Sequence, residues 1–465
     1  MAGLSDCKIE IVRTLVESAP DKIVGGLQRA LAQTGGDSVL AGVRQLVEAE
    51  VCDRILRNAI FQPIAPLCVG DGSGTHSLVF PARALAGVWR GLKTYADEQV
   101  TAAATASAAV AKAIAEGEHP PDSGEAFDLV VAAAAEALRA GELPEFRAVL
   151  DLCDAARPGG GEAFIACLDI SAVVRRAVPR VGDWAARPNE ETGAAARLAY
   201  KDAVAIAEDA GPRFFDMLAG QLTPHGLVLR IISAVMDKPT ERYLADSELG
   251  GFPERVMDEI DEALKAIGKL DLDAGPPAGR AAGRMVELIT QQTFELEACV
   301  ELTREHGWGH RIVGQKKALA NLIESRLRDT EKLLATALPM LSPGFSRPRR
   351  TGPKLDQPPD PKTVTRTMTL LTLLHETRLC ANYGGFSAMH TKVTEKLWGA
   401  VEHYVEEVLD HLRTGDVADL AIAHAFLRVA ADVIGLVRDE KSAELVRRRA
   451  ATACAPPDNT VLIDA

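Results

Sequence analysis

Four polar side chains near the start of the C-terminal third have the types and spacing of a small-molecule site. His375, Arg378 and Asn382 are spaced i, i+3, i+7, and a helical wheel places them within an apolar arc. Polar groups in such an arc are costly without partners, so a shared network is expected, with Tyr383 close enough in sequence to join it. Arg378 would bind an anionic ligand. The alternative is a network that only holds helices together.

Two groups of histidines have metal-ligand spacing. The segment His306 to His310 has the HxxxH pattern, but its two glycines predict a turn and the glutamate of an HExxH motif is absent. His403, Glu407 and His411 are spaced i, i+4, i+8, on what the helical wheel predicts to be a charged, partly solvated flank. Neither group predicts a metal site, and no other cofactor is expected.

The glycine-rich segment from Gly70 to His76 is the remaining candidate for ligand binding. It could hold an anion with its amides, but it lacks the GK[ST] ending of a P-loop and the twelfth-position glutamate of an EF-hand loop. We interpret it as a flexible loop. The chain has no Ser-His-Asp, Cys-His or Rossmann pattern at a strand-to-helix junction, so no catalytic residue is predicted and a non-enzyme is favoured.

Composition and charge narrow the class of protein. The 465 residues are 47% hydrophobic and 25% charged, which indicates a chain with a normal folded core. The formal net charge of −13 makes the protein acidic and disfavours nucleic acid as a partner. The two basic runs, Arg347 to Lys354 and Arg447 to Arg449, are the cationic segments that could oppose this trend.

The cysteines and the N-terminus predict a soluble cytoplasmic protein. The eight cysteines are scattered without a CxxC pair, so we expect reduced thiols, most of them buried. The N-terminus has neither the basic region nor the apolar region of a signal peptide. Residues 100–115 are too rich in Ala, Thr and Ser to span a membrane, so no membrane association is expected.

The fold predicted is all-α, with antiparallel helix pairs followed by a C-terminal helical bundle. Aromatic residues make up 5% of the chain, and Ala-rich periodic runs alternate with Gly and Pro breaks at irregular intervals. At most a small strand element is expected, near residues 69–80. Apolar residues at three- and four-residue steps between 286 and 338 predict two long helices that fold back on each other as a hairpin.

Breaks in the helical pattern also predict the domain organisation. The clearest is a Pro-rich basic linker at 339–360, which composition predicts to be extended and exposed. The expected parts are an N-terminal helical region at 1–95, an Ala-rich helical region at 96–275, the hairpin at 276–338, the linker, a C-terminal bundle at 361–455 and a mobile tail at 456–465.

Abundant paired helices without a catalytic pattern predict a non-catalytic scaffold or regulatory protein that binds a protein partner. The alternative is a helical sensor or enzyme for an anionic small molecule, with its site at His375, Arg378, Asn382 and Tyr383. Assembly as a homo-oligomer is left open by the sequence.

Overall fold

The computed structural model of the chain describes residues 11–13, 15–16, 19, 21–33, 38–70, 78–186, 189–341 and 352–453. Over these residues the protein is built of α-helices with three short 3₁₀ helices, which confirms the all-α fold. The strand element expected near residues 69–80 is a single bridge between Cys68 and Phe80, and residues 71–77 of the glycine-rich loop lie outside the described residues.

The chain divides into two compact units, Met1–Lys238 with Asp246–Leu249, and Pro239–Ala245 with Gly250–Ala465. The helices of the first unit are α2 (Asp21–Gln33), α3 (Ser38–Ile60), η1 (Ala65–Leu67), α4 (Arg83–Tyr95), α5 (Asp97–Glu116), α6 (Gly124–Ala140), α7 (Pro144–Ala156), α8 (Gly160–Asp169), α9 (Ser171–Ala186), α10 (Glu190–Ile206), α11 (Ala210–Gly220), η2 (His225–Leu227) and α12 (Val228–Met236). Those of the second unit are α13 (Glu241–Ala245), α14 (Gly251–Gly268), η3 (Leu272–Ala274), α15 (Pro276–Cys299), α16 (Gly307–Ala337), α17 (Pro361–Glu376), α18 (Ser387–Thr414), α19 (Leu420–Val437) and α20 (Glu440–Ala453).

In the first unit, helices pack through close contacts and one partly buried arginine. Gly91 of α4 leaves room for the Phe146 ring of α7, since a Cβ at this glycine would lie 2.6 Å from that ring. Arg175 of α9 donates hydrogen bonds to the carbonyls of Ala59 and Ile60 at 3.1 and 2.6 Å and pairs with Asp128 of α6 at 2.8 Å. The arginine thus supplies the cation that a helix C-terminus favours and joins the end of α3 to α6 and α9.

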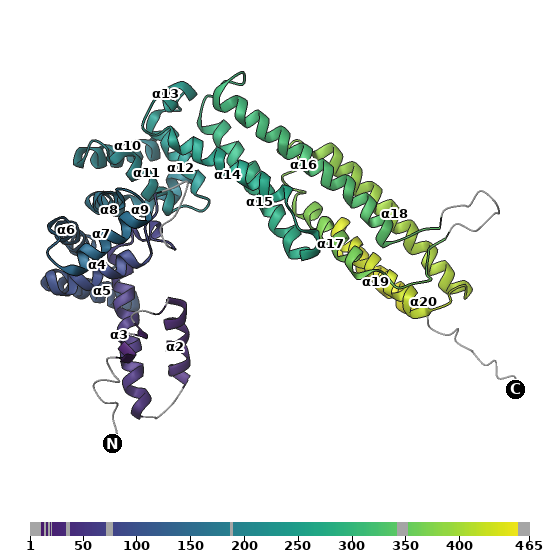
Figure 1. The fold of residues 1–465 in the computed structure, drawn as a ribbon, viewed down its shortest axis with the longest axis horizontal. Helices are drawn as coiled ribbons and strands as arrows, with labels where there is room; N and C mark the ends of the chain where they lie inside the picture. The colour runs from purple at the N-terminus through teal and green to yellow at the C-terminus, as the bar shows by residue number, and fades with distance from the viewer. Residues whose placement is uncertain are drawn as a thin grey trace. The chain divides into compact units, whose positions relative to one another are not determined.

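The second unit is a bundle of long helices in which α17 packs against both α15 and α16 (Figure 1). Two glycines of α15 make this possible. A Cβ at Gly279 would lie 2.1 Å from the carbonyl oxygen of Thr369, and one at Gly283 would lie 2.4 Å from the Cβ of Glu376. Helix α15 packs much more extensively on α17 than on α16, its expected hairpin partner, since only glycine permits so near an approach.

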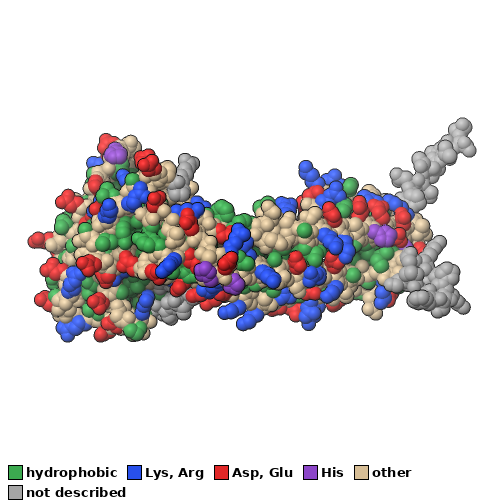
Figure 2. Space-filling model, turned by 90° about the horizontal axis from the view of Figure 1, so that it is seen from above, with side chains coloured by type: hydrophobic (Ala, Val, Ile, Leu, Met, Phe, Trp, Pro, Cys, Tyr) green, Lys and Arg blue, Asp and Glu red, His purple; other side chains and the backbone are tan. Residues whose placement is uncertain are grey.

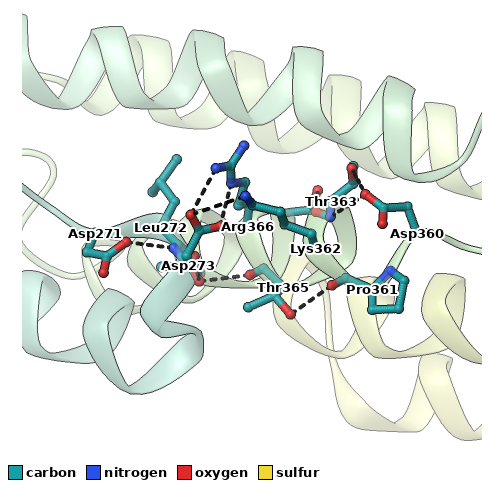
Figure 3. Close-up of polar contacts among 11 residues, drawn as sticks. Asp271, Leu272, Asp273, Asp360, Pro361, Lys362, Thr363, Thr365 and Arg366 are labelled. Carbon is teal, nitrogen blue, oxygen red and sulfur yellow. Dashed lines mark hydrogen bonds and ion pairs between the residues drawn. The ribbon is translucent and has the colours of Figure 1, made fainter.

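Polar contacts fix the start of α17 next to η3 (Figure 3). Asp360 accepts a hydrogen bond from the backbone N–H of Thr363 at 2.9 Å and so caps the helix, as its N-cap position requires. The carboxylate of Asp273 accepts two hydrogen bonds from Arg366, from Nε at 2.6 Å and from Nη2 at 2.9 Å. These contacts join segments on the two sides of residues 339–360.

The predicted linker at 339–360 therefore does not separate the compact units, which divide instead between residues 238 and 250. At its described ends Met340 and Pro353 form an antiparallel bridge, with Lys354 donating its N–H to the carbonyl of Pro339 at 2.9 Å. The basic residues Arg347, Arg349 and Arg350 lie outside the described residues.

Helix α19 is the one helix in the described part of the chain that is long and apolar enough to cross a membrane. It packs against α17, α18 and α20 in the second unit (Figure 1). Phe426 and Val433 of this helix are buried. Of its residues, 39% are buried against the rest of the protein.

Candidate functional site

The candidate site is a surface on the second unit where α15, α16 and the turn after α17 meet. We call it the Tyr383 surface and define it by Phe294, Glu297, Val313, Lys316, Leu379 and Tyr383. Tyr383 is one of the residues that the sequence predicts for ligand binding. The others come from separate parts of the chain.

Tyr383 is held in place by contacts from two helices. Its ring packs edge-on against Phe294 of α15, with centroids 5.5 Å apart. The ammonium of Lys316 on α16 lies 4.5 Å from the ring centroid, a cation–π contact. The hydroxyl donates a hydrogen bond to Glu297, and burial together with this carboxylate raises the pKa of Tyr383 above its ordinary value. The hydroxyl therefore stays protonated at neutral pH.

The charges of this surface are paired with each other. Lys316 Nζ lies 3.2 Å from each carboxylate oxygen of Glu297. This pair is half-exposed, so by itself it adds little stability, but it neutralises both charges beside the aromatic rings. The Lys316–Glu297 pair at the centre of the surface is therefore neutral overall.

Apolar side chains at the edge of the surface are left open to solvent. Leu379 is 89% exposed, and Phe294 and Val313 are about half exposed, at 48% and 46%. Leu379 lies in the same turn as Tyr383, and Val313 lies one turn before Lys316 on α16. Single exposed apolar residues are common, but here they occur on the same elements as a tyrosine fixed by its neighbours, and aromatic residues are enriched in protein contact sites.

The structure places three of the four residues of the predicted small-molecule site in the turn after α17, whereas His375 lies in α17 itself. The helical wheel treats residues 375–382 as one helix, but α17 ends at Glu376, so Arg378 and Asn382 lie in a turn and are exposed rather than within an apolar arc. His375 Nδ1 lies 3.0 Å from the carbonyl oxygen of Leu436 on α19. The described contacts of His375 and Tyr383 therefore lead to different helices.

The predicted histidine groups have structural contacts. The turn that the sequence predicts over 306–310 is instead the start of α16, because Glu241 accepts hydrogen bonds from the backbone N–H of Trp308 and Gly309 at 2.5 and 3.3 Å. In α18, His411 Nδ1 lies 2.9 Å from the carbonyl oxygen of Glu407. Among the described residues, no group of three or more His, Cys, Asp or Glu side chains is placed to hold a metal ion.

The basic residues near the end of the described chain are paired with carboxylates. Arg449 forms a two-pronged pair with Glu406 of α18 at 2.6 and 2.7 Å, and Arg447 pairs with Asp432 of α19 at 3.0 Å, so these basic residues are held within the bundle. On the face seen in Figure 2, basic and acidic side chains are interspersed.

The buried thiol of Cys153 is not a reactive group. Burial raises the pKa of this thiol to about 12, which keeps it protonated and unreactive.

The sequence missed most of the Tyr383 surface. Phe294 and Lys316 belong to helices whose apolar seams are readable, but both residues lie off those seams. An exposed phenylalanine in a long helix was the signal available, and nothing in one sequence joins it to Tyr383. No protein-family model, no curated protein and no solved structure matches this chain.

Proposed function

We propose that the chain is a non-catalytic interaction protein that binds a partner protein through the Tyr383 surface. The observation that carries the proposal is the 89% exposure of Leu379, in the same turn as a tyrosine that is fixed by Phe294, Glu297 and Lys316. A rigid aromatic centre with exposed apolar side chains around it is the arrangement that dominates binding energy at protein interfaces.

The energetics favour an apolar partner surface. Full burial of a leucine or phenylalanine side chain contributes about 1.5–3 kcal/mol, so covering Leu379 would gain most of that amount and covering the half-exposed Phe294 a smaller part of it. Lys316 is paired with Glu297, and the carboxylate of Glu295 also acts on Tyr383, so the charges at the centre do not favour an anion. Arg378 is exposed in the same turn and could pair with a carboxylate at the rim of the partner.

The anionic-ligand function needs His375 and Arg378 in one pocket. His375 is directed to the backbone of α19, whereas Arg378 is exposed in the turn. The placement of these residues supports the protein-binding function better.

Affinity purification of the full chain from the cells that naturally make it tests the proposal. We expect a partner in stoichiometric amount with the wild type, and its loss with Leu379→Asp and with Phe294→Asp. Leu198 of α10 is 62% exposed on the other unit, so Leu198→Asp is the matched control and should keep the partner. Retention of the same partner by both test variants, or its equal loss with the control, would contradict the proposal.

A further inference from the structure

A groove of about 1050 Å³ lies on the first unit, between α6 and α9. This volume is just above the range of small-molecule pockets, which is roughly 300–1,000 Å³. The ion pairs Arg175–Asp128 and Arg139–Asp169 join the two helices in opposite chain directions, so α6 and α9 run antiparallel. The groove therefore has two helical walls, and none of its lining residues belongs to the Tyr383 surface.

Each wall has the residue spacing of one side of a helix. The lining includes Glu125, Leu129 and Ala132 of α6 and Ala172, Arg176 and Pro179 of α9. Both sets are spaced i, i+4, i+7, which places each set along one side of its helix. Seven residues rise about 10 Å along a helix axis, or about two turns. The walls therefore match the length of two turns of a third helix.

Apolar side chains of the groove are open to solvent. Leu129 is 57% exposed, and Ala132 and Pro179 are exposed as well. Pro179 lies inside α9, where a proline removes one hydrogen bond of the helix, and it gives this wall a rigid apolar ring. Ala132, Ala172 and Gly124 are small, so a helix in the groove could approach both walls closely.

Arg175 holds the two walls in place. Its Nε pairs with Asp128 at 2.8 Å, and its Nη1 and Nη2 donate hydrogen bonds to the carbonyls of Ala59 and Ile60 at 3.1 and 2.6 Å. The guanidinium also lies 5.4 Å from the ring centroid of Phe127, which lines the groove. The charge of this arginine is therefore used within the protein, and the groove is formed before any partner binds.

Two charged side chains of the lining remain open to a partner. Glu125 on the α6 wall and Arg176 on the α9 wall are both exposed, and neither forms an ion pair with the described part of the chain. Asp122 adds a second exposed carboxylate before the start of α6, where it accepts a hydrogen bond from the N–H of Gly124 at 2.8 Å. One wall is therefore acidic and the other is basic, a pattern that favours a partner with charges of opposite sign on its two sides.

We propose that the groove binds about two turns of an amphipathic helix from a partner protein, as in other helix-in-groove complexes. Apolar side chains of that helix cover Leu129 and Pro179. A basic side chain on one flank lies beside Glu125, and an acidic side chain on the other flank lies beside Arg176. A second copy of this chain is a poorer occupant, because it presents the same hollow face and two hollows cannot fill each other.

Selection from a phage library of random peptides of about 16 residues, roughly four turns of helix, tests the proposal on the full chain. The library is first depleted on Leu129→Asp and then selected on the wild type. We expect enriched peptides with apolar residues at i, i+4 and i+7, Lys or Arg on one flank and Asp or Glu on the other. Failure to enrich any peptide, or enrichment of peptides without this pattern, would overturn the proposal.

Titration with the most enriched peptide, made synthetically, measures the contribution of each wall. Leu129→Asp should weaken binding about tenfold or more, whereas Leu198→Asp, at a leucine of similar exposure in the same unit, should leave it unchanged. Arg176→Glu should weaken binding about fivefold, and a peptide whose acidic flank is changed to Lys should restore it. Arg180→Glu, at the exposed position one turn further along α9, should have little effect. Equal losses in the test and control variants, or no recovery with the Lys peptide, would contradict the proposal.

Two further measurements distinguish other occupants and the other surface. Sedimentation equilibrium should give the same mass for the wild type and Leu129→Asp, and a wild-type dimer that becomes a monomer in this variant would assign the groove to a second copy. Leu379→Asp lies on the second unit and should bind the peptide normally. Loss of peptide binding in Leu379→Asp would mean that the peptide binds the Tyr383 surface instead, and it would overturn the proposal for the groove without contradicting the proposed function.

Discussion

The backbone of α15 at Gly279 lies so close to α17 that a Cβ there would be 2.1 Å from the carbonyl oxygen of Thr369. A backbone oxygen inside a helix cannot move aside as the end of a flexible side chain can. The glycine is therefore required for the contact between the two helices, and with it for the packing order of the second unit.

Gly279→Ala should lower the free energy of unfolding of the second unit by about 1–3 kcal/mol through overpacking. Gly314 of α16 is the matched control because it is exposed and a Cβ there meets nothing within 4 Å. Gly314→Ala should raise stability by about 0.5–1 kcal/mol, since alanine favours the helix. Denaturant unfolding measures both, and equal effects would show that α15 and α17 are not in close contact.

The buried carboxylate of Glu241 holds the first turn of α16. It accepts hydrogen bonds from the backbone N–H of Thr303 at 3.1 Å and of Trp308 at 2.5 Å. Glu241→Ala leaves these donors without partners and should cost about 2 kcal/mol. Glu241→Gln keeps one acceptor oxygen and should cost less, and Arg242→Ala, at the exposed next position, should have little effect. Amide hydrogen exchange measures this most directly: exchange at Trp308 and Gly309 should be faster in Glu241→Ala. Unchanged exchange would show that Glu241 does not hold the first turn of α16.

These contacts show where the sequence was informative and where it was not. The seam Ile312, Leu319, Ile323 and Leu327 is buried as predicted, because a helix seam depends only on spacing within one segment. The close approach at Gly279 was not predicted, since it depends on a partner helix that follows much later in the chain. The end of α17 at Glu376 was missed because an apolar leucine at 379 continued the helical pattern into a turn.

The residues of the candidate site show the same difference between patterns within one segment, which the sequence reveals, and contacts between distant segments, which it does not. The sequence did not single out Tyr404, whose side chain is buried in α18. That Ala335 and Ala400 line one cavity could not be read, because it requires the register between α16 and α18. Tyr383 was predicted as a site residue, but its partners Phe294 and Lys316 come from two other helices.

Tyr404→Phe should stabilise the protein. The substitution removes a buried hydroxyl that has no partner in the described part of the chain and leaves the ring in its place. We expect the free energy of unfolding to rise by about 1 kcal/mol, since an unsatisfied buried polar group is destabilising by roughly this amount or more. Tyr95 is partly exposed on α4 of the other unit, so Tyr95→Phe serves as a control with little expected change. A loss of stability in Tyr404→Phe would mean that the hydroxyl is hydrogen-bonded.

The start of α17 should make the second unit sensitive to acid. The hydrogen bond from Arg366 lowers the pKa of Asp273, and the hydrogen bond from the Thr363 side chain lowers the pKa of Asp360. Both carboxylates therefore stabilise the fold at pH values above about 4, the ordinary value for the unfolded chain, and lose this effect as pH falls through their lower folded values.

The double variant Asp273→Asn with Asp360→Asn should show a smaller fall in Tm between about pH 5 and pH 2 than the wild type. Asp183→Asn, at an exposed position of α9 in the first unit, should keep the wild-type dependence for the second unit. Identical pH profiles for the wild type and the double variant would rule out a contribution from these carboxylates.

Photo-crosslinking from position 379 tests most directly whether the Tyr383 surface binds a protein partner. A photoreactive phenylalanine analogue replaces Leu379 in the full chain, and Leu198 in the control, and each protein is irradiated in the cells that naturally make it. The proposed function predicts one discrete crosslinked partner from position 379, absent from position 198 and lost when Phe294→Asp is added. Products of the same pattern and yield from both positions, or no discrete product from position 379, would contradict it.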